Sequence, residues 1–159
     1  MTEQELIAAI EALNREEVLE AMLAMRDILG LAGTDAPDAA RGFAEELREK
    51  PYAALDDVED IARAALVLAA LDPEHREEMK QVVARAGEMN FIFGGAEIIA
   101  IGIAAALVIE RIKGGRERTE SETVITESAD GGKQIVHRER TVYRPNEKMG
   151  KIVSALFEG

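Results

Sequence analysis

The sequence lacks cysteine and tryptophan and has only two tyrosines and four phenylalanines in 159 residues. The absence of cysteine excludes disulfide bonds, thiolate metal sites and a cysteine nucleophile. Because hydrophobic residues still make up 47% of the chain, its core must be built from Ala, Leu, Ile, Val and Met. Small and aliphatic side chains of this kind favour closely packed helices. The length fits one compact domain.

The net charge of −12 is unevenly distributed along the chain. Residues 1–90 carry 21 acidic and 9 basic side chains, whereas residues 91–159 carry 10 of each. An acidic surface repels phosphate backbones, and the neutral part has neither a basic stripe nor enough aromatic residues to bind bases, so we expect no nucleic-acid partner. The first residues are acidic and do not resemble a secretory signal. The cytoplasm is therefore the expected compartment.

Residues 1–90 predict an acidic helical bundle, because apolar residues recur there at helical spacing. Asn14 followed by Glu17 is a candidate capping box, which leaves one long helix or two over residues 6–29. The segment 30–38 has the composition of a loop, and Pro51 should end a short helix that begins near Pro37. Further helices are expected over residues 56–71 and 73–86.

Residues 91–113 form the most apolar stretch, with Glu97 as the one charged residue between positions 91 and 109. A helix that begins after the glycine pair 94–95 would place Glu97 in its first turn, where the helix dipole favours a carboxylate. The remaining apolar run has 12 residues, a length typical of a buried core or interface helix.

The alternative interpretation of this stretch is a single membrane span over about residues 91–112, which would place the protein in the inner membrane. The apolar side chains there supply enough transfer free energy to offset one buried carboxylate. In that case Glu97 would be a candidate proton or ion site.

Small residues in the same stretch predict a close helix–helix contact. Ala100 and Ala104 lie on one line of the helix, and Gly102 and Ala106 form a second pair with the same spacing. Glu97 and these four positions are the candidate interface for a partner or a second copy. Replacing Gly102 with leucine should then shift the mass distribution of the oligomer.

Residues 117–159 predict a β-hairpin followed by an amphipathic helix over about residues 147–157. Thr, Val and Ile are frequent in segments 119–127 and 133–143, and an Asp-Gly-Gly turn separates them. An isolated two-stranded ribbon needs further packing. Its charged residues are therefore further interface candidates: Glu120, Glu122, Arg138 and Arg140. The predicted fold class is α+β, a mainly α-helical bundle with a C-terminal β-hairpin and a short terminal helix, arranged as one compact domain.

No catalytic, metal-binding or cofactor-binding motif stands out in the sequence. Asp72 and His75 have helical ligand spacing, but a carboxylate metal bundle needs two Glu-x-x-His units. His137 lies far in sequence from any serine with a nucleophile motif. The acidic cluster 56–60 lacks the spacing and the turn glycine of a calcium loop and should cap a helix. We expect no catalytic residue, no metal and no cofactor, and hence no enzyme.

Residues 96–141 carry a resemblance to a known group of proteins. A helix rich in small residues runs from Glu97 to Lys113, and a polar segment around an Asp-Gly turn follows from Thr123 to Thr141. This order resembles the small effector-associated adaptor components of bacterial conflict and defence systems, which accompany caspase-like or NTPase effectors. The resemblance implies an adaptor or assembly role and carries over no functional residue.

The expected function is thus a non-enzymatic protein–protein interaction and homo-oligomerisation module. Its expected partner is a protein or a second copy of the chain. The alternative function is that of a small, multimeric, single-span membrane protein.

Overall fold

A computed structural model describes residues 2–88, 93–119, 123–127, 133–137, 140–143 and 147–158. Side chains are described for residues 2–88, 93–112 and 147–156. Helices dominate this part of the chain, with these bounds: α1 (Glu3–Ala12), α2 (Arg15–Ile28), the 3-10 helix η1 (Asp38–Ala40), α3 (Arg41–Glu49), α4 (Leu55–Leu71), α5 (Arg76–Arg85), α6 (Gly95–Thr119) and α7 (Glu147–Glu158).

The break between α1 and α2 follows from the capping box that the sequence predicts. The side chain of Asn14 accepts a hydrogen bond from the backbone N–H of Glu17 at 2.9 Å. The Glu17 carboxylate in turn accepts one from the backbone N–H of Asn14, also at 2.9 Å. The predicted capping box is thus confirmed. Because the box starts a new helix at Arg15, residues 3–28 form two helices and not one.

The box gives a first testable prediction. Asn14→Ala removes one of the two capping hydrogen bonds, so the free energy of unfolding should fall by about 1 kcal/mol. Urea unfolding followed by far-UV circular dichroism measures the change. A midpoint unchanged from the unsubstituted chain would show that α2 does not depend on this cap.

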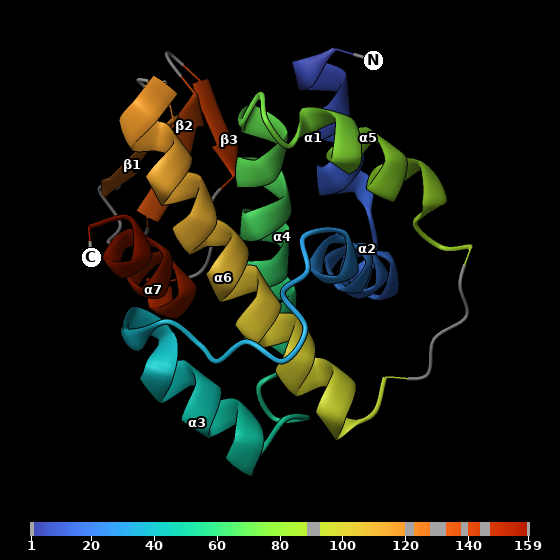
Figure 1. Cartoon of the computed structure of the whole chain (residues 1–159), viewed down its shortest axis with the longest axis vertical. Helices are drawn as coiled ribbons and strands as arrows, with labels where there is room; N and C mark the ends of the chain where they lie inside the picture. Colours follow the sequence, from blue (N-terminus) through green and yellow to red (C-terminus); the bar gives the residue numbers. More distant parts are fainter. Residues whose placement is uncertain are drawn as a thin grey trace.

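The core forms around α4 and α6, which pack along each other (Figure 1). Most of α4 is inaccessible to solvent, and its run of alanines and leucines keeps the inter-helix distance short. In Figure 1, α2 lies on one side of α6 and α3 and α7 lie on the other, and all three contact α6. One hydrophobic cluster includes buried residues from α1 to α7.

Gly102 explains how α3 reaches α6. A Cβ atom at this position would lie 2.4 Å from Cδ1 of Leu47 and 3.5 Å from Cε2 of Phe43, both on α3. Val58 on α4 would lie 3.6 Å away. The glycine therefore provides room for neighbouring side chains of the same chain to enter the α6 surface.

The predicted α+β class is wrong, because the chain is mainly helical. Where side chains are described, 78% of the residues are helical and no strand occurs, so no β-hairpin contributes to the described core. The segment predicted as a two-stranded hairpin instead pairs through three short strands: β1 (Thr123–Glu127), β2 (Lys133–His137) and β3 (Arg140–Tyr143). Their order is β1-β2-β3 and both pairings are antiparallel. The predicted single strand 133–143 thus divides in two.

The apolar helix α6 begins at Gly95 and has one side in the protein core. Ile98, Ile101, Val108 and Ile109 are all buried against neighbouring helices. Within the described residues, no helix combines the length and the apolar character that crossing a bilayer requires.

Candidate functional site

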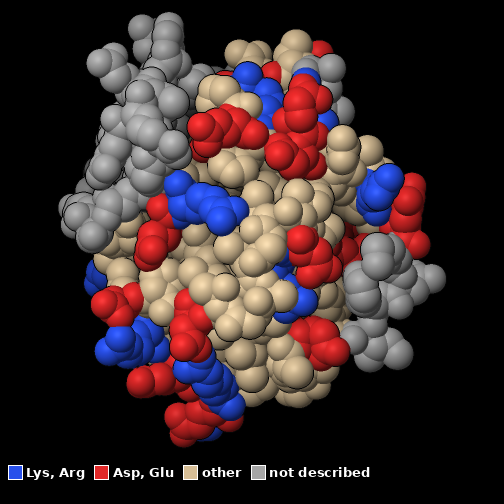
Figure 2. Space-filling view, viewed as in Figure 1, with Lys and Arg blue, Asp and Glu red and all other residues tan. Residues whose placement is uncertain are grey.

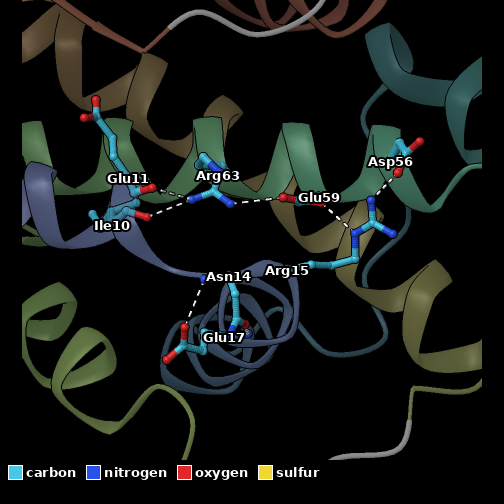
Figure 3. Close-up of polar contacts among 8 residues, drawn as sticks. All are labelled: Ile10, Glu11, Asn14, Arg15, Glu17, Asp56, Glu59 and Arg63. Carbon is cyan, nitrogen blue, oxygen red and sulfur yellow. Dashed lines mark hydrogen bonds and ion pairs between the residues drawn. The ribbon is translucent and has the colours of Figure 1, made fainter.

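Two arginines on different helices converge on one carboxylate, as Figure 3 shows. Arg15, at the start of α2, donates from Nε to Glu59 on α4 at 2.6 Å and also pairs with Asp56. Arg63, one turn further along α4, donates to the other oxygen of Glu59 at 3.1 Å. Arg63 also donates to the backbone carbonyl of Ile10 at 2.9 Å. The network fixes the α1–α2 corner against α4.

The electrostatics of this network favour the charged forms of its members. Burial of Glu59 by itself raises its pKa, but hydrogen bonds from Arg15 and Arg63 outweigh the burial and hold the pKa below its usual range. The hydrogen bond to Glu59 likewise raises the pKa of Arg15. The charges are thus mutually compensated, and the arrangement is structural.

A second charge cluster holds α7 against the bundle. Lys148 donates to the two oxygens of Glu46 at 2.7 and 2.8 Å and to Asp57 at 3.0 Å. Burial lowers the pKa of Lys148, but these hydrogen bonds outweigh it and raise the pKa above its usual value. One lysine therefore joins α3, α4 and α7.

One face of the molecule is largely free of charge. Figure 2 shows a band of other residues over the middle of α6 and over the α2–η1 loop that runs across it in Figure 1, with Lys, Arg, Asp and Glu on both sides of the band. We define the neutral face by the uncharged residues of the loop and of α6 that are exposed or half-buried: Ala32, Gly33, Thr34, Ala96, Ile99, Ala100, Ile103 and Leu107. The charged residues Asp35, Glu97, Glu110 and Arg111 are also exposed on these two segments and border the face.

The loop has both a packed side and a solvent side. Leu31 and Pro37 are buried, whereas residues 32–35 between them are exposed. Arg111 on α6 donates to the carbonyl of Leu29 at 3.3 Å, which attaches the start of the loop to this helix. At the edge of the face, a carboxylate oxygen of Asp35 lies 4.0 Å from a guanidinium nitrogen of Arg48. The loop and α6 therefore contribute to one continuous surface.

The predicted interface residues of α6 divide between surface and core. Glu97 is exposed and Ala100 is half-buried, so both are accessible. Gly102 is buried, and Ala104 and Ala106 are 1% and 0% exposed. The close contact that their small size permits is made inside this chain. The sequence pattern predicted close packing but did not distinguish an internal contact from an external one.

The predicted interface residues of the strand segment are not described as side chains. Glu120, Glu122 and Arg138 lie outside the described residues. Arg140 is the first residue of β3, where it pairs with His137, and its side chain also lies outside them.

The residues that organise the charge clusters were missed from the sequence. Arg15 lies 41 and 44 positions from its partners, and Lys148 lies 102 and 91 positions from its own. From the sequence, the acidic residues 56–60 at the start of α4 indicate helix capping alone. Their concentration of carboxylates was the one indication that basic residues from elsewhere should pack there.

Two hollows in the described part of the surface are small. A groove of about 110 Å³ between α2 and α5 is lined mainly by apolar atoms, with Arg85 and Gln81 among its residues. A polar hollow of about 230 Å³ lies over Asp56, Glu59 and Arg63. Both are below the roughly 300–1,000 Å³ of typical small-molecule sites.

Comparison of the chain with protein-family models, with curated proteins and with solved structures finds no match.

Proposed function

We propose that this chain is a non-enzymatic interaction module that self-associates through the neutral face. The observation that carries the proposal is the half-buried α6 stripe of Ile99, Ile103 and Leu107, together with the uncharged loop residues 32–34, on an otherwise highly charged surface. Depletion of charge at the centre of a patch distinguishes interfaces from ordinary surface. The cytoplasmic location and the adaptor role expected from the sequence belong to the same proposal.

The charge of the chain favours a second copy as the occupant of this face. A net charge of −12 makes two molecules repel one another wherever their acidic surfaces approach. The repulsion is smallest where both copies present the neutral face, because few like charges then come close. A two-fold pairing of the same patch on both copies meets this condition.

Introducing a carboxylate into the face should separate the copies. We expect Ala96→Glu and Ala32→Glu each to weaken self-association at least tenfold, because the added charge would be desolvated beside its own symmetry copy. Neither substitution should unfold the chain, since both positions are exposed. At position 96 a glutamate also suits the first turn of α6, because the helix dipole favours a negative charge there. Size-exclusion chromatography with light scattering measures the shift from dimer towards monomer.

Ala84→Glu is the matched control for these variants. It adds the same side chain at an exposed helical position of α5, outside the neutral face. It should leave the oligomer unchanged. Equal effects of Ala84→Glu and Ala96→Glu would show that net charge, and not this face, governs association.

A further inference from the structure

The turn between α4 and α5 brings together three side chains of metal-binding types. One ligand atom each from Asp72, Glu74 and His75 lies within 4.8 Å of the others. The site stands apart from the neutral face and from the two charge clusters, and its donors are one imidazole nitrogen and two carboxylate oxygens.

Two of the three ligands already have the separation that a shared ion requires. Oδ2 of Asp72 lies 3.2 Å from Nδ1 of His75, and their side chains are 8% and 11% exposed. Two atoms bound at about 2.0–2.1 Å to a tetrahedral zinc ion lie about 3.3 Å apart. The other carboxylate oxygen of Asp72 accepts a hydrogen bond from the backbone N–H of Glu74 at 2.9 Å, and hydrogen bonds of this kind orient the ligands at metal sites.

The local charge balance also points to a cation. Among the described side chains, no lysine or arginine pairs with Asp72 or Glu74. The adjacent Arg76 is turned elsewhere, because it donates to Glu3 at 2.6 Å and to the carbonyl of Ala70 at 3.1 Å. A capped turn accounts for the contact between Asp72 and His75. It leaves the neighbouring carboxylate of Glu74 without a basic partner among the described side chains.

The geometry points to a divalent-metal site, with Zn²⁺ held by Asp72, Glu74 and His75. Mixed imidazole and carboxylate donors suit zinc, and three protein ligands leave a fourth position for water. Asp72 ends α4 and His75 precedes α5, so the bound ion would join the two helices at their turn.

Isothermal titration of the chelator-treated chain with zinc chloride tests the site. We expect one Zn²⁺ per chain, and at least tenfold weaker binding to His75→Gln and to Glu74→Gln. Cobalt should occupy the same site and give the visible absorption of a four-coordinate ion with nitrogen and oxygen ligands. Binding should also raise the midpoint of thermal unfolding in the unsubstituted chain.

Glu77→Gln is the charge-matched control, since Glu77 is an exposed carboxylate of α5 that pairs with Lys80 at 3.0 Å and lies outside the triad. It should bind zinc like the unsubstituted chain. Glu74 is exposed, so Glu74→Gln keeps the test valid if His75→Gln fails to fold. Absence of a one-to-one titration, or equal affinities of Glu74→Gln and Glu77→Gln, would overturn the assignment.

Discussion

Replacing Gly102 with leucine is expected to lower the free energy of unfolding by about 3 kcal/mol or more. Even a Cβ at this position would lie 2.4 Å from Cδ1 of Leu47, and Leu47 is fully buried and has little room to move. The further side-chain atoms would enter the space held by Phe43 and Val58. Urea unfolding followed by circular dichroism measures the loss. The sequence alone predicts that Gly102→Leu shifts the mass of the oligomer, whereas the internal contact with Leu47 predicts a loss of stability.

Gly42→Leu is the control for this overpacking. Gly42 is exposed on α3, and a Cβ there would meet no atom within 4 Å. Since leucine has the higher helix propensity, the free energy of unfolding should stay constant or rise by up to about 1 kcal/mol. A Gly102→Leu chain as stable as the Gly42→Leu chain would contradict the placement of α3 against α6.

Neutralising Glu59 should have the second-largest effect, a loss of about 2 kcal/mol in the free energy of unfolding at pH 7. The glutamine of Glu59→Gln has no charge to hold Arg15 and Arg63, and its amide group replaces one of the two acceptor oxygens. Glu45→Gln is a suitable control, because Glu45 is an exposed carboxylate of α3 outside this network. Chemical unfolding of both variants measures the difference.

The effect of Glu59→Gln should depend on pH in one direction. The pKa of Glu59 is lowered in the folded protein. Its stabilising contribution is therefore complete above the unfolded pKa of about 4.3 and is lost as the pH falls through the folded value. The unsubstituted chain should lose its advantage over Glu59→Gln below about pH 4.3. A difference that stays constant from pH 7 to pH 3 would exclude this coupling.

Local features of the fold could be predicted because local chemistry causes them. Asn14 and Glu17 lie three residues apart and satisfy the backbone donors at a helix start whatever the rest of the chain does. Gly30 and Gly33 take positive φ values of 67° and 80° in the loop after α2, a conformation that glycine favours. The predicted loop 30–38 rests on this preference.

Tertiary relations could not be predicted in the same way. The small side chain of Gly102 indicates a close approach, but only the folded chain shows that the approaching residue is Leu47. The pairing of Arg15 with Glu59 likewise depends on how α2 crosses α4, which hydrophobic periodicity does not specify. The α+β class was wrong because helices make up 78% of the residues whose side chains are described. Thr- and Val-rich segments predict strands without specifying what share of the fold they form.

The candidate sites show the same difference between local features, which the sequence predicts, and tertiary contacts, which it does not. Glu97 and Ala100 were predicted as interface residues and are accessible, whereas the loop residues of the neutral face were missed because nothing in the sequence places that loop beside α6. The spacing of Asp72 and His75 in the sequence indicates two possible ligands, which is too few to predict a metal site. The position of the Glu74 carboxylate beside Asp72 and His75 appears only in the folded turn.

Sedimentation velocity over a range of protein concentrations tests the central claim, self-association through the neutral face, most directly. We expect a 17.3 kDa chain that dimerises as its concentration rises. Added salt should strengthen the dimer, because it screens the repulsion between two acidic molecules while the contact itself is uncharged. A single monomeric species at every concentration and salt level would contradict the account. A dimer that salt dissociates would assign the contact to ion pairs elsewhere on the surface.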